Sequence, residues 1–491
     1  MDPKHSIELN EKVNVSQDAI PVHDHARKAE KRLRTKVDFF VVPIMTLLYL
    51  MCFIDRTNIG NARLAGFEKD LKLKGYDYNT VLSVFYVSYI LFEIPATMCC
   101  KLMGPGWFLP LTTFGFGAAS IATAFVKTRA QACAVRFVLG MFEAGVMPGC
   151  AYYLSRWYKR SELTFRLGLW VTMAPLSGAF GGLLASGILK LNHLGALHGW
   201  QMIFIVEGII TMGVALIALF ILTDRPDTAR WLTEEQKELA INRVKSERLN
   251  QAVLLDKIDR TKLARGFTNP VTLATATIFF LNNVTVLGIS FFLPTIVKSI
   301  YPTRTTIQLQ LLTVPPYVVG AICTVFITAL SWKYNHRQIL IMCTGPTVIV
   351  GYSIFLATMN SNVRYAAVFL SASTAFSLGA MTNAQVSANV LSDSARSIAI
   401  GTNGLFAYLG GLVATWTYLP TDAPRYFIGN GINVTCAALW TAIAIGTGIW
   451  MKYDNRKRDR RQDGAREELA GLTAKEVQDL EWKHPEWRWK L

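Results

Sequence analysis

The chain has 491 residues, of which 52% are hydrophobic and only 17% charged, and it carries a formal net charge of +16. A soluble protein of this length would normally carry more charge, so the composition argues against a soluble multidomain chain. The surplus of Lys and Arg gathers between apolar segments, which indicates membrane sidedness and argues against nucleic-acid binding.

The apolar segments are long enough to cross about 30 Å of hydrocarbon at ~1.5 Å per residue. In chain order they cover residues 40–54, 82–100, 107–126, 132–154, 167–189, 201–222, 270–293, 309–331, 339–358, 366–391, 399–419 and 431–451. These roughly twelve segments predict an all-α membrane protein whose helices form two bundles of six.

The polar stretches divide the chain into five predicted regions. They are an N-terminal tail (1–36), a first bundle (37–222), a loop (223–268), a second bundle (269–453) and a C-terminal tail (454–491). Thr233 followed by Gln236 is a capping-box pattern, which predicts a surface helix over 234–249 within the loop. The positive-inside rule predicts that both termini and this loop lie in the cytosol.

Charged residues within apolar segments are costly and usually persist where they pair or line a watery cavity. Six such residues occur, all in the first half: Asp55, Arg56, Glu93, Arg136, Glu143 and Glu207. The corresponding segments of the second half carry neutral amides instead, among them Asn283, Asn389 and Asn403, which we predict to contact substrate.

Arg136 and Glu143 are seven residues apart, which places them on nearly one helix face about 10.5 Å apart along the axis. A direct contact would be stretched, so we expect partners on another helix, with Asp55 as the obvious one. A carboxylate whose protonation responds to a nearby guanidinium suits proton coupling. The alternative is a fixed ion pair that only holds helices together.

The cysteines, histidines and carboxylates show neither metal-ligand spacing nor a nucleophile–base motif. We therefore expect no enzyme activity, no metal and no cofactor, with protons as the coupling ion. We expect the partners to be a small carboxylate, the proton and the lipid bilayer, and the chain to be a monomer.

Several motifs together resemble the fungal anion:cation symporters, the allantoate permease branch of the major facilitator superfamily. They are FIDRTNIGNARLAG (53–66), RFVLGMFEAGVMPGCAYYLSRWYKRSE (136–162), WQMIFIVEG (200–208), DRPDTARWLTEEQ (224–236) and HPEWRWKL (484–491). The resemblance implies the major facilitator fold and proton-coupled import of organic anions such as allantoate, nicotinate or pantothenate. It also implies a fungal plasma membrane.

By the same resemblance, Arg56 would hold the substrate carboxylate, Asp55 and Glu143 would titrate, and Arg136 would be their moving counter-charge. Where relatives often have Asn before the Gly-Gly of the eleventh segment, this chain has Tyr408. A Tyr offers a stacking face and one hydroxyl, which favours an aromatic or apolar-bodied acid.

Three further aromatics, Tyr86, Tyr89 and Trp170, are candidates to line the same cavity, and helix packing is the alternative for each. Because the same transport cycle runs in both directions, export of an acidic metabolite by proton antiport stays open. A nutrient receptor that binds without transporting is a third alternative.

Overall fold

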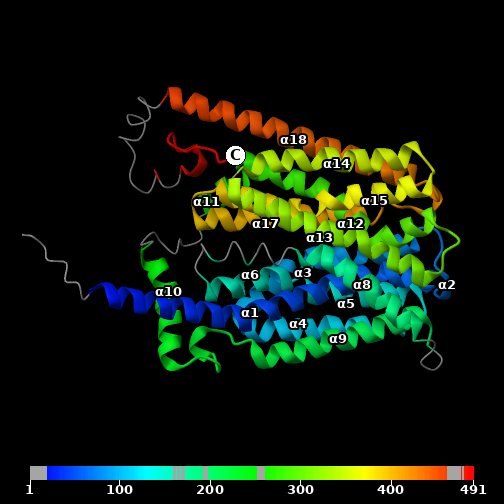
Figure 1. The fold of residues 1–491 in the computed structure, drawn as a ribbon, viewed down its shortest axis with the longest axis horizontal. Coiled ribbons are helices and arrows are strands. Elements are labelled where there is room, and N and C mark those ends of the chain that lie inside the picture. Colours follow the sequence, from blue (N-terminus) through cyan, green and yellow to red (C-terminus); the bar gives the residue numbers. More distant parts are fainter. Residues whose placement is uncertain are drawn as a thin grey trace, which may run out of the picture.

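In a computed structural model the chain is described at residues 19–158, 162, 166, 172–191, 197–250, 260–334, 336–461, 477 and 480–491. Regular structure within these residues is helical and includes no strand. The long helices run side by side in one bundle (Figure 1), with the short helix α2 (Phe67–Asp70) at one end and α10 (Glu234–Asn250) at the other. We call these the α2 end and the α10 end.

The first half of the chain supplies one side of the bundle (Figure 1). Its long helices are α1 (Ala19–Leu64), α3 (Asp77–Met103), α4 (Pro105–Thr123), α5 (Arg129–Glu143), α6 (Val146–Trp157), α8 (Met173–Lys190) and α9 (Gly199–Ile221). Within this half α4 packs against α9, and α3 packs against α5.

The second half supplies the other side. Its long helices are α12 (Pro270–Ile300), α13 (Thr306–Tyr334), α14 (Arg337–Ala357), α15 (Ser361–Ala375), α16 (Leu378–Ala388), α17 (Asp393–Ala414) and α18 (Phe427–Arg460). Here α12 packs against α17, and α14 packs against α18. The chain segment that connects the halves contains α10, at the predicted position, and a short helix, α11 (Arg260–Phe267).

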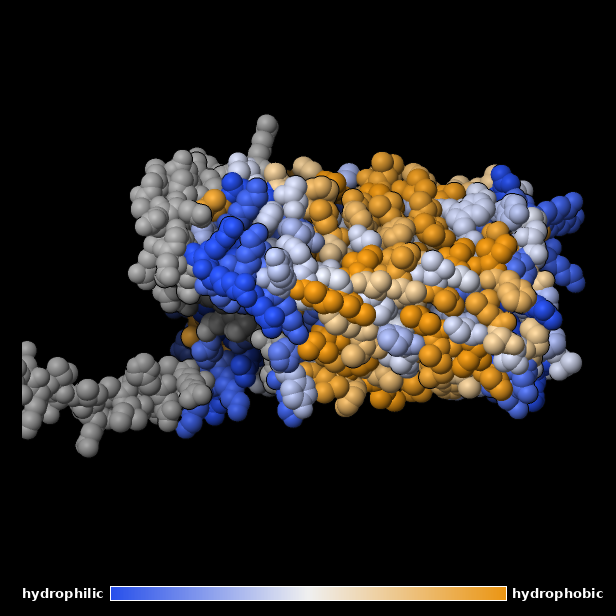
Figure 2. All heavy atoms as spheres, turned by 90° about the horizontal axis from the view of Figure 1, so that it is seen from above, coloured by the Kyte–Doolittle hydropathy of each residue, from blue (hydrophilic) through white to orange (hydrophobic). Residues whose placement is uncertain are grey.

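Ten helical segments among the described residues are long and apolar enough to cross a membrane. Helices α4 and α8 correspond to the predicted segments 107–126 and 167–189 and pack in the same bundle, α4 on α9 and α8 on α13. Figure 2 shows the apolar band across the helices, with hydrophilic side chains at both ends. The predicted all-α membrane fold is confirmed.

Helix α1 is longer than the apolar segment 40–54 that predicted it. It continues through Asp55 and Arg56 to Leu64, because the polar residues that follow, such as Asn58 and Asn61, are buried in the bundle. At its other end the helix begins at Ala19 and so includes the second half of the predicted tail 1–36.

The fourth predicted segment is broken between α5 and α6, directly after Glu143. Pro148 explains the break, because proline has no N–H to donate to the carbonyl of Ala144 four residues earlier. Gly145 lies in the break, where an added Cβ would come within 2.6 Å of the Phe108 ring. The break therefore consists of residues 144 and 145, between the buried acid Glu143 and Pro148.

Hydrogen bonds join the two halves at the α2 end. Asn79 Nδ2 on α3 donates to the carbonyl of Thr415 at 2.6 Å, and the hydroxyls of Ser83 and Thr415 lie 2.7 Å apart. Gln310 Nε2 on α13 donates to the carbonyl of Asn61 on α1 at 3.1 Å. The structure therefore describes a state in which the halves are in contact at the α2 end.

Residues 480–491, which we call the C-terminal strap, pack against the α10 end of the second half. Trp489 is 3% exposed and lies with Val271 and Met451 in a small apolar cluster. Its backbone N–H donates to Asn455 Oδ1 on α18 at 2.9 Å, and Trp482 Nε1 donates to the carbonyl of Arg265 on α11 at 3.1 Å. The predicted polar tail thus contains an ordered element.

Candidate functional site

Arg56 on α1 and Glu143 at the end of α5 form a buried ion pair inside the first half. Arg56 Nη2 and Nε lie 2.9 and 3.2 Å from the same oxygen, Glu143 Oε2. The thiol of Cys52, one turn earlier on α1, donates to that oxygen at 3.3 Å. The other oxygen, Glu143 Oε1, is buried and has no hydrogen-bond partner among the described residues.

Aromatic rings enclose the guanidinium of Arg56. Its central carbon lies 4.9 Å from the ring centre of Phe53, 5.2 Å from that of Phe85 and 5.1 Å from that of Tyr89. Cations are attracted to such ring faces, most strongly where water is excluded. Arg56 is therefore a fixed positive charge in an apolar, aromatic setting, which suits binding of an anion with an apolar body.

Tyr89 on α3 and Tyr408 on α17 meet across the two halves next to this guanidinium. Their hydroxyls are 3.0 Å apart and their ring centres 4.4 Å apart. The Tyr408 hydroxyl also lies 3.1 Å from the sulfur of Met147 on α6. The predicted substrate contact Tyr408 thus lies near Arg56, and opening this tyrosine pair requires the halves to move apart.

Asp55 faces a different neighbour from Arg56, because consecutive helical residues point about 100° apart. It is fully buried, and its two oxygens accept hydrogen bonds from Ser120 on α4 at 2.8 Å and Thr211 on α9 at 3.1 Å. Glu207 lies one turn before Thr211, and both its carboxyl oxygens are buried without a described partner. The first half thus holds two separate groups of buried carboxyls.

Arg136 on α5 pairs with neither Glu143 nor Asp55 in the described hydrogen bonds. It is 2% exposed, and its Nε and Nη2 are buried without a hydrogen-bond partner among the described residues. Its guanidinium lies 5.9 Å from the ring centre of Phe204. The expected pairing of Arg136 with Asp55 is not observed in this state, and Glu143 finds its partner on another helix, as the spacing predicted.

The predicted amides of the second half have different hydrogen-bond partners and do not bond to one another. Asn283 on α12 is half-buried and donates to the carbonyl of Phe279 on its own helix at 3.0 Å. Asn403 on α17 donates to Asn383 Oδ1 on α16 at 2.8 Å, leaving its own Oδ1 buried and unpaired among the described residues.

Asn389 lies at the α10 end instead. Its side chain exchanges two hydrogen bonds with the backbone of Lys490 in the C-terminal strap, at 2.8 and 3.0 Å. The structure therefore does not bring Asn389 together with Arg56, and a substrate contact there stays a prediction. Trp170 lies outside the described residues.

The sequence prediction missed three side chains that contact the buried acids: Cys52, Ser120 and Thr211. Cys52 had a weak signal, since a residue four positions before Arg56 lies on the same helix face. Ser120 and Thr211 had none, because hydroxyls are frequent in membrane helices and usually bond to their own helix. Tyr89, a candidate for the cavity, lies beside Arg56, and its role in lining a cavity stays a prediction.

Comparisons with known proteins identify the family. The model of the Major Facilitator Superfamily matches residues 45–415. The high-affinity nicotinic acid transporter of Saccharomyces cerevisiae is 32% identical over 441 residues, which cover 90% of this chain and 81% of that protein. An uncharacterized transporter of Schizosaccharomyces pombe is 32% identical over 471 residues, covering 95% of this chain and 91% of that protein. The family and these relatives are transporters, so the prediction that the chain is not an enzyme is confirmed.

A solved structure confirms the fold. The xylose transporter XylE from E. coli, in a partially occluded inward open conformation, aligns with a TM-score of 0.62 and 15% identity. The alignment covers 82% of this chain and 97% of that one. The fold, the matched model and the relatives agree, and the chain belongs to the major facilitator superfamily and to its fungal transporters.

Proposed function

We propose that this transporter takes up a small organic carboxylate together with protons, by alternating access of the two halves. One observation carries the proposal: Arg56, a buried cation beside the tyrosines that join the halves, is neutralised by a carboxylate with one free oxygen. Arg stays charged under all physiological conditions. It can therefore hold a substrate carboxylate whenever Glu143 releases it.

In this mechanism Glu143 and the substrate compete for Arg56. A proton that binds Glu143 at Oε1 removes the negative charge that holds Arg56. The guanidinium is then free to bind the carboxylate of the substrate by charge-assisted hydrogen bonds. When substrate and proton leave on the other side, the Arg56–Glu143 pair forms again. Carrying a monoanion with one proton is electroneutral, so a pH gradient alone drives uptake.

Asp55 and Arg136 form the second part of the proposed coupling machinery. Asp55 is a second buried acid that can hold a proton, and Arg136 is a cation without a described partner. An unpaired buried charge is costly, so Arg136 is stabilised whenever a neighbouring carboxylate becomes charged. We propose that Arg136 stabilises Asp55 and Glu143 in turn as they lose their protons.

The aromatic shell of Arg56 favours a planar or apolar-bodied acid, and a nicotinic acid transporter is among the relatives. Nicotinate is therefore the first substrate to test, followed by pantothenate and allantoate. A thermal-shift screen of the purified protein against these acids, at acidic and at neutral pH, would identify the substrate. We place the transporter in the plasma membrane, where an inward proton gradient would drive uptake.

The coupling role of Glu143 is tested in proteoliposomes with an imposed pH gradient and labelled nicotinate. In Glu143→Gln the side chain is permanently neutral, so we expect exchange of substrate across the membrane but no accumulation. Arg56→Ala should abolish both. Glu68→Gln, which breaks the Arg63–Glu68 pair (2.6 Å) near the α2 end, is the control and should accumulate substrate normally. Accumulation by Glu143→Gln at the wild-type level would refute the coupling role.

A further inference from the structure

The first turns of α1 carry cations on two different faces, and only one face is used inside the protein. On that face Arg34 lies 3.5 Å from Glu162, and Asp38 lies 2.6 Å from Arg166. Lys36 lies at the edge of the other face, where it donates to Gln236 on α10 at 2.9 Å. These contacts fix α1 against neighbouring segments.

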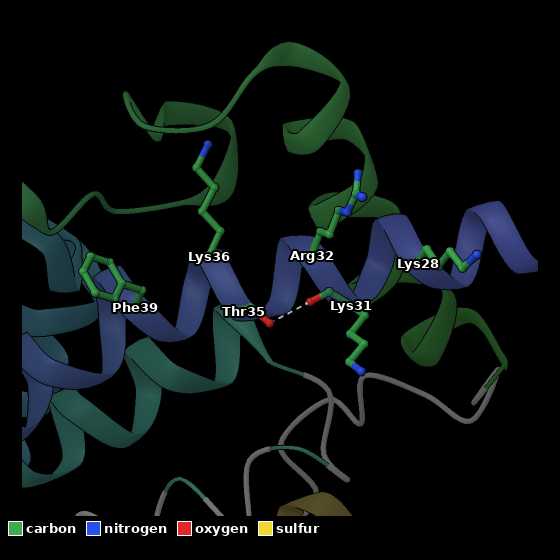
Figure 3. A pocket seen from close by; sticks show the side chains of 6 residues that line it. All are labelled: Lys28, Lys31, Arg32, Thr35, Lys36 and Phe39. Carbon is green, nitrogen blue, oxygen red and sulfur yellow. Dashed lines mark hydrogen bonds between the residues drawn. The ribbon is translucent and has the colours of Figure 1, made fainter.

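Three other cations of the same stretch remain exposed: Lys28, Lys31 and Arg32. None of them has an ion pair or side-chain hydrogen bond to a described residue. With Thr35, Lys36 and Phe39 they line an open hollow of about 560 Å³ beside α1. Figure 3 shows the three cationic side chains spreading outward from one stretch of the helix, with Thr35 and Phe39 further along it.

The depth of these residues along α1 indicates what they meet. Phe39 is 75% exposed where the apolar part of the helix begins, so it faces the acyl chains. Arg32 and Lys28 lie seven and eleven residues before it, which is about 10 and 17 Å nearer the α10 end. The headgroup layer extends roughly 5–8 Å beyond the hydrocarbon on each side. Arg32 therefore lies at or just beyond the headgroups, with Lys28 and Lys31 outside them.

We propose that this face of α1 is a binding site for an anionic phospholipid whose headgroup carries a phosphate monoester. Such a headgroup projects beyond the phosphodiester layer and brings more than one negative charge to the three free cations. The acyl chains pack beside Phe39. The two acids of the same stretch of α1 are engaged by other cations, because Asp38 pairs with Arg166 and Glu30 lies 3.9 Å from Arg243.

The test uses the purified full-length protein in mild detergent, titrated with a dioctanoyl phosphatidylinositol monophosphate, and binding is followed by native mass spectrometry. The variant combines Lys28→Gln, Lys31→Gln and Arg32→Gln. The control removes three exposed cations from α18 at the same end of the bundle, by Arg456→Gln, Lys457→Gln and Arg460→Gln. An unchanged unfolding temperature shows that each variant is folded.

We expect the α1 variant to bind the lipid about a hundredfold more weakly, since each of the three cations contributes roughly fivefold near a membrane surface. The control should bind like the wild type, and phosphatidylcholine should not compete. Equal losses in both variants would overturn the proposal in favour of diffuse charge attraction. Equally strong binding of inorganic phosphate would overturn it in favour of a free-phosphate site.

Discussion

At the scale of single residues, the neighbouring side chains Asp55 and Arg56 on α1 contact different helices. Arg56 points to Glu143 on α5, whereas Asp55 points to hydroxyls on α4 and α9. One turn of α1 therefore touches three other helices of the first half through two consecutive charges. The contacts of Asp55 are made with hydroxyls, which donate to the charged carboxylate and can turn to accept from its protonated form.

A pair of substitutions separates the structural part of Asp55 from its charge. Asp55→Ala leaves the hydroxyls of Ser120 and Thr211 without their acceptors, which should destabilise the fold by about 2 kcal/mol. Asp55→Asn keeps an acceptor and the shape of the side chain, so its unfolding temperature should match the wild type. Thermal unfolding in detergent measures both, and equal unfolding temperatures for the two variants would show that these hydrogen bonds stabilise nothing.

The sequence predicted that Asp55, Arg56, Arg136 and Glu143 form one region of the first half, and all four are buried there. It could not predict which of them pair. Pairing depends on how α1 is rotated against α5, and a rotation of about 100° exchanges the directions of Asp55 and Arg56. The helix bounds alone do not determine that rotation.

At the scale of elements, the C-terminal strap connects helices that are far apart in the sequence. Its Trp489 packs with Val271 of α12 and Met451 of α18, and its Lys490 backbone bonds to Gln385 of α16 and to Asn389 directly after that helix. The sequence showed only a polar tail with several tryptophans. Asn389 was predicted to contact substrate because it is an amide within an apolar segment. Its partner in the structure, Lys490, is 101 residues away, so no local sequence pattern could reveal the contact.

The packing of the C-terminal strap against the second half should depend mainly on Trp489. Trp489→Ala removes a buried indole and its 2.7 Å hydrogen bond to Asp454, which should lower the free energy of unfolding by about 3–5 kcal/mol. Arg488→Ala removes a surface ion pair with Asp459 and two hydrogen bonds to the carbonyls of Pro485 and Trp487, but no buried apolar side chain, so it should cost less than Trp489→Ala. Unfolding temperatures and limited proteolysis of the C-terminus measure both. A strap equally protected in Trp489→Ala and wild type would contradict this role.

At the scale of the whole molecule, the two halves contribute unequal chemistry. The buried acids Asp55, Glu143 and Glu207 lie in the first half together with the cations Arg56 and Arg136, whereas α15 of the second half buries the cation Arg364. The second half meets this region through Tyr408, which contacts Tyr89. Transport by alternating access requires the halves to separate at the α2 end, where Asn79, Ser83 and Gln310 now join them. The free energy of the contacts between the halves at the α2 end therefore influences what fraction of the protein is closed at that end.

Gly60 tests this dependence, because α1 and α12 approach each other closely there. An added Cβ would lie 2.5 Å from the carbonyl oxygen of Phe291, a backbone atom that cannot turn aside. Gly60→Ala should therefore push the halves apart at the α2 end and shift the population toward the state open on that side. Gly187→Ala on α8 is the control, since its Cβ would meet nothing within 4 Å.

Spin labels at the exposed residues Lys74 and Arg304, one in each half, report the separation by pulsed dipolar spectroscopy. The exposed Cys99 and Cys343 and the partly exposed Cys133 and Cys323 are replaced first, so that the accessible thiols are the two introduced ones. We expect a longer mean distance in Gly60→Ala than in wild type or Gly187→Ala. If the distance distribution of folded Gly60→Ala matched that of the control, the close approach of α1 and α12 would not limit opening. The equilibrium would then depend on the hydrogen bonds of Asn79 and Gln310 instead.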